Sequence, residues 1–544
     1  MKGILIKSFL VAGAIAIITS GCVNAAKDSM EGMDHSTMNS NTPTTTTTTD
    51  TNSIKLTSAT PVTDGKEFTI TAQESNLEVT PGQVLPVWTF NNSVPGPQIR
   101  VKVGDTVKVN LKNELKEPVS IHWHGYPVPN DMDGIPGVTQ DAVVPGKTFT
   151  YEFKATVPGT YWYHSHQDSV NQLDKGLYGS LIVEDPNEKY DKDFTLMLDE
   201  WMSSGDMDMS NQESNNPDNK MDMEGMDHSN MNMDDMNMDD MNMDDMDMSN
   251  MDMAGHDMSM YDIYTINGKS GDAIEKLTVN EGDKVRIRLV NAGYISHKMH
   301  LHGHDFKVIS SDGQPINNPE VIKDQLISIA PGERYDIEFT ANNPGSWLLE
   351  EHGEESKNMK TVIQYEGSDA QKDKSNSSKD LRTFDLAQYG VLVNSNFSLD
   401  ETTFDQEINM DLNTEMKNGE MVYTINGKVY PDTEKLNVKK GDKVKVTFVN
   451  RSKTDDHPMH LHGHFFQVLS KNGKPLQESP IMKDTLNVKP GEEYVIAFEA
   501  DNPGDWMFHC HDLHHASSGM VTEVKYSDYQ TNYTPDPNVN NKAE

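Results

Sequence analysis

The chain contains one block of sequence twice, and this repeat restricts the fold more than any other feature. The first copy begins at Tyr264 with YTINGK and continues through VNEGDKVRIRLVN, HKMHLHGH and APGERYDIEFTANNPGSW. The second begins at Tyr423 with YTINGK and continues through VKKGDKVKVTFVN, HPMHLHGH and KPGEEYVIAFEADNPGDW. A more divergent copy lies upstream, in IRVKVGDTVKVNLKNEL, IHWHGYPV and VPGKTFTYEFKATVPGTYWYHSH. Three copies of one unit predict three similar domains.

Each copy has the pattern of short β-strands. Val101, Val103, Val107 and Val109 alternate with polar residues, and the Gly-Asp pair at 104–105 interrupts the run. Alternation with a period of two places apolar side chains on one face of a strand. Pro-Gly and Asn-Pro-Gly turns recur at strand-like intervals. We therefore expect an all-β chain of three tandem sandwiches, at 56–190, 191–366 and 380–530.

Three pairs of histidines are spaced two residues apart. The pairs are His122 and His124, His164 and His166, and His460 and His462. In a strand, residues i and i+2 point to the same side, so each pair should present two imidazoles to one site. Several such pairs fit a closely spaced metal cluster. Imidazole binds copper, zinc, iron and nickel, so the pairs alone do not identify the metal.

A cysteine between two histidines narrows the choice of metal. In His509-Cys510-His511 the two histidines should share one face while Cys510 points to the other. His515 and Met520 follow, and His457 precedes them. One thiolate, two imidazoles and a weak methionine ligand compose a blue-copper electron-transfer site. The sequence thus predicts copper.

The segments HWHG, HSH, HPMHLHGH and HCHDLHH occur in this order and extend over most of the chain. Together they resemble the ligand motifs of three-domain bacterial multicopper oxidases, of the laccase and cuprous-oxidase kind. The resemblance implies tandem cupredoxin-like Greek-key sandwiches. It also implies an oxidoreductase that uses four copper ions, one of type 1, one of type 2 and two of type 3. A donor would be oxidised one electron at a time, and dioxygen would be reduced by four electrons to water.

The resemblance also assigns roles to individual residues. The implied type 1 ligands are His457, Cys510, His515 and Met520. The implied type 2 ligands are His122 and His460. The implied type 3 ligands are His124, His164, His166, His462, His509 and His511. Asp133 lies where the family has a carboxylate that manages protons during oxygen reduction; the alternative for Asp133 is a plain Asp-Gly turn.

Two positions depart from the family pattern. The middle copy keeps HKMHLHGH, but the counterpart of His-Cys-His is Glu350-Glu351-His352. Without a thiolate it cannot form a blue-copper site, and we expect a copper-free domain; a residual or adventitious metal site is the alternative. Many relatives have acidic residues beside the last type 1 histidine, whereas this chain has His514 and Ala516. The route of protons to the cluster is therefore unassigned.

The N-terminus is typical of an exported lipoprotein. Residues 1–21 combine two lysines with a short apolar run, and the run ends in Thr-Ser-Gly before Cys22. We expect cleavage before Cys22 and lipid on this cysteine, which would anchor the protein to the outer face of a bacterial cell membrane. An ordinary secretory signal is the alternative. Residues 22–55 are polar and threonine-rich, as in a disordered stalk.

A methionine- and aspartate-rich insert within residues 203–260 gives a hint about the electron donor. Thioethers favour Cu(I), and carboxylates concentrate cations. Cu(I), in copper tolerance, is therefore the expected donor. Asp455 and Asp456, just before His457, could guide a metal ion or belong to a solvated turn. The alternatives are a laccase acting on phenols or aromatic amines, an Fe(II) or Mn(II) oxidase, and a non-enzymatic lipoprotein that sequesters copper.

The formal net charge of −39 excludes nucleic acid as a partner. Such a surface repels nucleic acid and attracts cations. The two cysteines have separate local explanations, so no disulfide is expected. The expected partners are dioxygen, a small reductant and, through the N-terminal lipid, a membrane; we expect a monomer.

Overall fold

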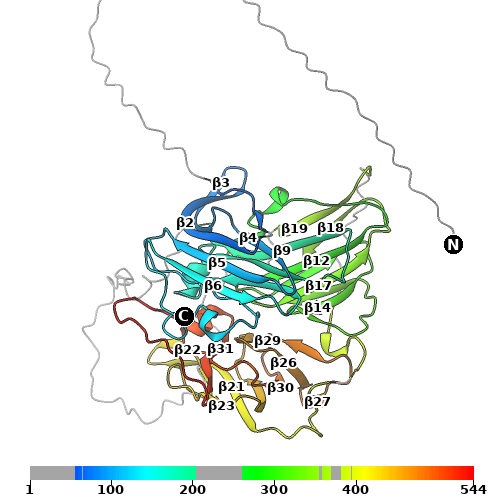
Figure 1. Ribbon diagram of the computed structural model, residues 1–544. Helices are drawn as coiled ribbons and strands as arrows, with labels where there is room; N and C mark the ends of the chain where they lie inside the picture. The colour runs from blue at the N-terminus through cyan, green and yellow to red at the C-terminus, as the bar shows by residue number, and fades with distance from the viewer. Residues whose placement is uncertain (1–55, 64, 204–259, 354–357, 369–380, 394) are drawn as a thin grey trace, which may run out of the picture. The chain divides into compact units, whose positions relative to one another are not determined.

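The computed structural model describes residues 56–63, 65–203, 260–353, 358–368, 381–393 and 395–544. Cys22 and most of the methionine-rich insert lie outside these ranges, as do residues 1–55, which include the expected signal and stalk. In the described ranges the strands form six sheets, which pack in pairs as three sandwiches. Figure 1 shows the three pairs in blue to cyan, green, and yellow to red. The predicted all-β class is confirmed.

The first sandwich packs the sheet β3-β2-β5-β6 against the sheet β1-β4-β8-β7. Its strands are β1 (Val62–Thr63), β2 (Glu67–Thr80), β3 (Gln83–Phe90), β4 (Gly96–Lys102), β5 (Thr106–Asn113), β6 (Thr148–Lys154), β7 (Gly159–His164) and β8 (Tyr178–Glu184). The alternation predicted for residues 101–111 is seen in β5, where Val107, Val109 and Leu111 are fully buried. The first 3-10 helix, η1 (Asn130–Met132), and helix α1 (Ser169–Asp174) lie in the loops.

The middle sandwich consists of the sheets β10-β9-β12-β17-β14-β15 and β11-β19-β18-β13-β16-β20. Its strands are β9 (Lys192–Trp201), β10 (Ile263–Ile266), β11 (Leu277–Val279), β12 (Lys284–Asn291), β13 (His297–Leu301), β14 (Lys307–Ser311), β15 (Gln314–Pro315), β16 (Gln325–Ile329), β17 (Arg334–Thr340), β18 (Ser346–Glu351), β19 (Lys360–Tyr365) and β20 (Arg382–Thr383). Ile263 pairs with Trp201, so the chain leaves β9 and returns in β10 at the same end of an antiparallel pair. The insert is therefore added to a hairpin without interrupting the sheet. The 3-10 helices η6 (Gly271–Ala273) and η7 (Leu386–Gln388) complete this region.

The third sandwich consists of the sheets β22-β21-β24-β30-β26-β27, with β28 paired to β26, and β23-β32-β31-β25-β29. Its strands are β21 (Gln406–Lys417), β22 (Glu420–Ile425), β23 (Leu436–Val438), β24 (Lys443–Asn450), β25 (His457–Leu461), β26 (Phe466–Lys471), β27 (Lys474–Pro475), β28 (Ile481–Lys483), β29 (Thr485–Val488), β30 (Glu493–Glu499), β31 (Asp505–Cys510) and β32 (Val521–Tyr526). Helix α2 (Leu513–Ser517) follows β31. The second repeat therefore begins within β22 and ends within β31.

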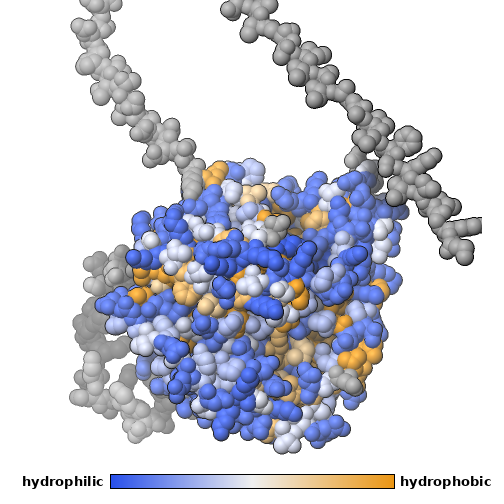
Figure 2. Space-filling model, viewed as in Figure 1, coloured by the Kyte–Doolittle hydropathy of each residue, from blue (hydrophilic) through white to orange (hydrophobic). Residues whose placement is uncertain are grey.

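Each sandwich has its own apolar core, and a further core contains residues of all three. The joining core brings Trp162 of the first sandwich together with Trp201 and Tyr261 of the middle one and with Leu513 of α2. The face in Figure 2 is mostly hydrophilic, with small hydrophobic areas among the hydrophilic residues. In the described ranges, no helix is long and apolar enough to cross a membrane. The shared core fixes the first and third sandwiches close enough to build one site.

Candidate metal centres

A cysteine and two histidines meet at the end of β31. Cys510 Sγ lies 3.6 Å from His515 Nδ1 and 3.9 Å from His457 Nδ1. His457 begins β25, and His515 is placed by α2, whose first turn is capped by the Asp512 carboxylate. Cys510 and His457 are inaccessible to solvent. Two imidazoles and one sulfur in this arrangement can ligate a single metal ion.

The protonation states of Cys510 and His457 are compatible with metal binding, in which the metal ion displaces the thiol proton. Burial raises the pKa of the Cys510 thiol and lowers the pKa of His457. A neutral imidazole offers a lone pair, and a bound metal ion would replace the thiol proton. Met520 is fully buried in the same core, and its carbonyl oxygen accepts a hydrogen bond from Cys510 N at 3.0 Å. The structure therefore brings all four expected type 1 residues together.

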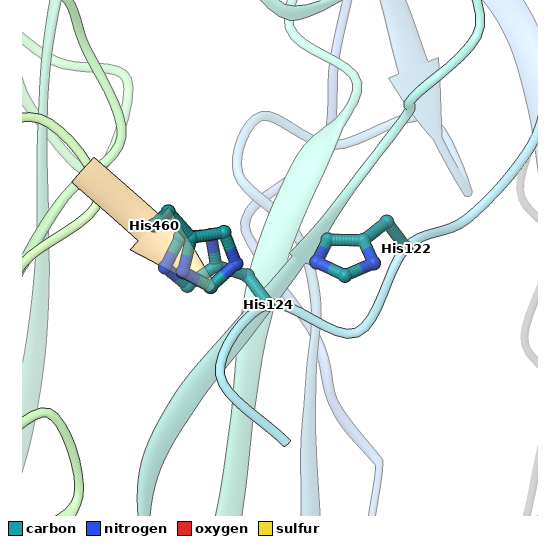
Figure 3. Close-up of side chains that lie close together, drawn as sticks. All are labelled: His122, His124 and His460. Atoms are coloured by element: carbon teal, nitrogen blue, oxygen red, sulfur yellow. The ribbon is translucent and has the colours of Figure 1, made fainter. Parts of the chain in front are cut away.

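Eight further histidines gather between the first and third sandwiches. They are His122, His124, His164, His166, His460, His462, His509 and His511, and each is at most 1% exposed. Two triads can each surround a metal ion, namely His124, His164, His511 and His166, His462, His509. The remaining two, His122 and His460, form a group with His124. Figure 3 shows His124 and His460 overlapping, with ring centroids 3.8 Å apart, and His122 beside them.

Hydrogen bonds orient the imidazoles toward one another. His460 Nδ1 donates to the Asp484 carbonyl at 3.0 Å, and His509 Nδ1 donates to the Cys510 carbonyl at 2.9 Å. His164 Nδ1 is bonded in the same way to the Ser165 carbonyl. Anchoring one ring nitrogen on a carbonyl leaves the other as a lone-pair donor, as in most metal-bound histidines.

The nitrogens that remain are buried and lack hydrogen-bond partners. They include Nε2 of His122, His164, His166 and His460, and Nδ1 of His124. Buried polar atoms without partners are costly unless something else satisfies them. Burial also lowers the pKa of His124, His164 and His462, and that of His166 to about 3, which keeps these four rings neutral. A set of neutral, convergent lone pairs fits copper ions.

The structure differs from the strand expectation at the histidine pairs. His122 forms only an isolated bridge with His164, and His462 follows the end of β25. The residue between the first pair, Trp123, is still buried on the opposite side, in the core of the first sandwich. Gly125 follows the pair with φ +72°, and a Cβ there would lie 2.3 Å from the Arg334 guanidinium. A tight turn, rather than a strand, positions these rings.

Asp133 lies directly behind the histidines. Its Oδ2 accepts a hydrogen bond from His462 Nδ1 at 3.0 Å, and its carbonyl oxygen lies 2.9 Å from His122 Nδ1. Gly134 must follow, because a Cβ there would lie 1.8 Å from the Ile121 carbonyl oxygen. Asp133 thus bridges an imidazole of the first sandwich and one of the third, a position from which it can orient both rings or exchange a proton with them.

Sequence reasoning missed the residues that fix the other side of the cluster. Arg334, from the middle sandwich, donates to both carboxylate oxygens of Asp484 at 2.7 and 2.6 Å. The Asp484 carbonyl and the Thr485 hydroxyl contact His460, and Thr485 Oγ1 also lies 3.1 Å from His124 Nε2. Arg334 and Asp484 are fully buried. The guanidinium holds the pKa of Asp484 well below its usual range, so the carboxylate stays charged.

A C-terminal segment was also missed. The carbonyl oxygen of Ala543 accepts a hydrogen bond from His166 Nδ1 at 2.5 Å. Glu544 Oε1 lies 3.4 Å from His509 Nδ1 and 3.6 Å from His166 Nε2. Burial raises the pKa of Glu544 to about 8. In the sequence this segment is a short polar tail without periodicity, so nothing there pointed to a place beside the cluster.

The two aspartates before His457 have local hydrogen bonds. Asp455 accepts one from the Thr414 hydroxyl at 2.6 Å, and Asp456 accepts one from the Asn487 amide at 2.8 Å. Both carboxyls are partly exposed beside the cysteine site. Burial raises the pKa of Asp456. These bonds fit a structural turn, and the remaining exposure leaves both carboxylates accessible to a cation.

Comparisons with known proteins agree with this chemistry. Family profiles described as multicopper oxidase match residues 71–188, 220–370 and 401–530. Multicopper oxidase MmcO of Mycobacterium tuberculosis is 32% identical, over 84% of this chain and 86% of the relative. Copper resistance protein A of Escherichia coli is 24% identical, over 85% and 92%. A solved multicopper oxidase from Pseudomonas thermotolerans shares the fold, with a TM-score of 0.62 at 24% identity, over 86% and 100%.

Proposed function

The chain belongs to the multicopper oxidase family, and we propose that it oxidises Cu(I) and passes the electrons to dioxygen by means of four bound copper ions. His457, Cys510, His515 and Met520 would hold the type 1 ion. His122 and His460 would hold the type 2 ion. The triads His124, His164, His511 and His166, His462, His509 would each hold one type 3 ion. The convergent, unpartnered nitrogens of the cluster carry this assignment.

Copper supplies one-electron redox chemistry in both places when bound. The chain's own contribution is to connect and enclose the two sites. Cys510 belongs to the type 1 set, and its sequence neighbours His509 and His511 belong to different type 3 triads. The covalent backbone therefore joins the two sites directly. Complete burial of these residues excludes water and fixes the ligand geometry.

The proposed donor rests on sequence and on relatives. The insert within residues 203–260 supplies many thioethers, which favour Cu(I) over harder ions, and many carboxylates, which concentrate cations. Partly exposed Asp455 and Asp456 adjoin His457 and would guide the ion toward the type 1 site. Two relatives carry the name copper resistance protein A, one from Escherichia coli and one a homologue from Pseudomonas syringae.

The proposed location follows from the N-terminal sequence. Cleavage before Cys22 and lipidation of this residue would hold the enzyme at the outer face of a bacterial membrane, where it would act as a monomer. Copper would then be oxidised before it enters the cytoplasm. Mass analysis of membrane-extracted protein tests this point, because a Cys22→Ser variant should lose the lipid mass and leave the membrane fraction.

The donor is tested by oxygen consumption with Cu(I), Fe(II), Mn(II) and a phenol as separate substrates. The matched variant replaces every methionine between residues 203 and 260 with leucine, which keeps the length and charge of the insert. We expect Cu(I) to be the fastest donor and only Cu(I) turnover to fall in the variant. Equal Cu(I) turnover in both proteins contradicts the role of the insert. Faster turnover of the phenol without added copper would instead identify a laccase.

A further inference from the structure

The middle sandwich contains a second gathering of histidines, separate from the sites described above. His300 lies in β13, His302 follows that strand, and Glu350 and His352 lie at the end of β18 and just beyond it. His302 Nε2 lies 3.1 Å from His300 Nδ1, 3.3 Å from His352 Nε2 and 3.0 Å from Glu350 Oε1. Glu350 Oε1 is also 3.4 Å from His352 Nε2. Four donor atoms from two adjacent strands therefore lie close together, and those of the three histidines lie within 4.8 Å of one another.

Hydrogen bonding alone cannot satisfy these contacts. A neutral Nε2 either donates one hydrogen or offers one lone pair, so His302 can complete only one of its three contacts. A metal ion accepts all four donors at once. For metal–nitrogen bonds of about 2.0–2.1 Å in a tetrahedron, the donors are separated by roughly 3.3–3.4 Å. Four of the donor pairs are separated by 3.0–3.4 Å, close to this spacing.

We propose that His300, His302, Glu350 and His352 form a binding site for a divalent first-row transition-metal ion, with Cu(II) preferred over Zn(II). Three imidazoles and one carboxylate suit divalent ions, and nitrogen–oxygen sites follow the stability order that places Cu(II) highest. The set has neither thiolate nor thioether, so it disfavours Cu(I). This fifth metal position corresponds to the alternative stated above for the middle domain, a residual metal site.

The surroundings of the cluster suit a cation that arrives from solvent. The Glu350 side chain is 20% exposed and that of His352 is 16% exposed, whereas His300 is only 6% exposed. The exposed carboxylate of Asp324 lies 3.8 Å from His300 Nε2 and adds negative charge beside the entrance.

The site cannot be a blue-copper centre. Glu351 stands at the strand position of Cys510, opposite Met299 as Cys510 is opposite Met459. Its carboxylate accepts hydrogen bonds from the backbone N–H groups of Lys298 and Gly353. A metal held at the neighbouring cluster therefore has only nitrogen and oxygen ligands, and its Cu(II) spectrum should show nitrogen couplings without sulfur charge transfer.

The test adds excess Cu(II) to the full-length, copper-loaded enzyme, removes weakly bound ions on a desalting column and counts copper per chain. The wild type should retain one more ion than the double variant His302→Ala/His352→Ala, and nitrogen superhyperfine lines of that ion should be absent from the variant. The insert is present in both proteins, so copper that it binds cancels in the difference. Equal copper counts, or equal nitrogen couplings, would overturn the site.

Two further variants separate ligand loss from misfolding and charge. Glu350→Gln keeps the shape of the side chain and should raise the dissociation constant for Cu(II) roughly 10- to 100-fold. Asp324→Asn removes a nearby charge without removing a ligand atom and should retain the extra ion. Visible absorption of the Cys510 centre reports whether each variant has folded. Displacement of the extra Cu(II) by equimolar Zn(II) would refute the metal preference.

Discussion

The third and middle sandwiches place the same motif, MHLHGH, on equivalent strands, yet the two copies have different chemistry. In the third, His460 pairs with His509 across β25 and β31; in the middle, His300 pairs with Glu350 across β13 and β18. The register is the same, so the backbone is not the cause of the difference. The side chains on the facing strand decide which metal chemistry each copy can support.

One histidine has the same structural role in both copies. His464 Nδ1 contacts the His462 carbonyl at 3.0 Å, and its Nε2 lies 2.7 Å from the Tyr526 hydroxyl. His304 repeats this arrangement with the His302 carbonyl at 3.0 Å and the Tyr365 hydroxyl at 2.6 Å. The last histidine of the motif therefore supports the loop, and its presence does not indicate a metal site.

The largest effect should come from removing the thiolate that distinguishes the two copies. Cys510→Ser replaces a soft ligand with a hydroxyl, so the blue absorption should vanish and oxygen consumption should fall below about 1% of wild type. Glu351→Cys provides the converse variant in the middle copy. It should not create a blue centre, because His297 Nε2 already lies 3.2 Å from the Glu200 carboxylate. More than a tenth of wild-type turnover in Cys510→Ser would contradict the assignment.

A second comparison concerns one ion pair near each copy of the motif, buried in one case and exposed in the other. Asp484→Asn removes the charge that pairs with Arg334 and leaves a buried guanidinium without its carboxylate. Loss of one partner from a buried pair costs about 3–5 kcal/mol. Denaturant unfolding should show this loss, and copper analysis should show a depleted cluster. Asp305→Asn breaks the exposed pair with Lys323 in the middle copy and should leave the denaturant unfolding curve nearly unchanged.

His462 and His302, the second histidines of the two MHLHGH motifs, contact different carboxylates. His462 is bonded to Asp133 of the first sandwich, whereas His302 contacts Glu350 within its own sandwich. Asp133→Asn should lower turnover or cluster copper affinity about 10- to 100-fold, because the ring of His462 loses its charged acceptor. Copper analysis distinguishes the two effects. Unchanged turnover at full copper content would show that Asp133 has only a structural role in the turn.

The shared structural histidine offers a matched pair of smaller changes. His464→Gln and His304→Gln each remove the imidazole that contacts a tyrosine hydroxyl. Each should lower the free energy of unfolding by about 1–3 kcal/mol, since a buried hydroxyl loses its partner. Denaturant unfolding of both variants measures this. A large loss of metal in only one variant would show that the two residues are not equivalent.

The last effect concerns pH, at a contact among Tyr261, Asp174 and His514. Tyr261 OH donates to the Asp174 carboxyl at 3.0 Å and lies 3.1 Å from His514 Nε2. Burial raises the pKa of Asp174 from 3.8 to about 8. The protonated form is favoured in the folded state, so its stabilising contribution is complete below pH 3.8 and is lost as pH rises toward 8.

This contribution can be isolated with Asp174→Asn, which cannot ionise. Between pH 4 and 8 the wild type should lose up to about 1.4 kcal/mol of stability per pH unit through this carboxyl. The variant should show a correspondingly shallower dependence in denaturant unfolding. Parallel curves for the two proteins would mean that Asp174 keeps an ordinary pKa in the folded chain.

The sequence was sufficient for the fold class and for bringing together the histidines and Cys510, because period-two alternation and repeated motifs are local patterns. It did not predict the roles of Arg334 and Glu544, which lie beside the cluster in the fold but outside its histidine segments in the sequence. Neither belongs to a histidine motif, and a buried ion pair such as Arg334–Asp484 depends on how two sandwiches pack. The cluster of His300, His302 and His352 could be recognised only from interatomic distances. In the sequence, the glutamate in place of the cysteine indicated only that a copper ligand had been lost.

The pairing of Arg334 with Asp484 has a consequence for anyone who wishes to shorten this protein. The middle sandwich supplies none of the proposed ligands of the four copper ions, and by that measure it looks dispensable. Excising it would strand the Asp484 carboxylate beside His460 without a counter-ion. An enzyme made of the first and third sandwiches alone would therefore need another cationic side chain beside Asp484. The ligand motifs alone would not be sufficient to build the cluster.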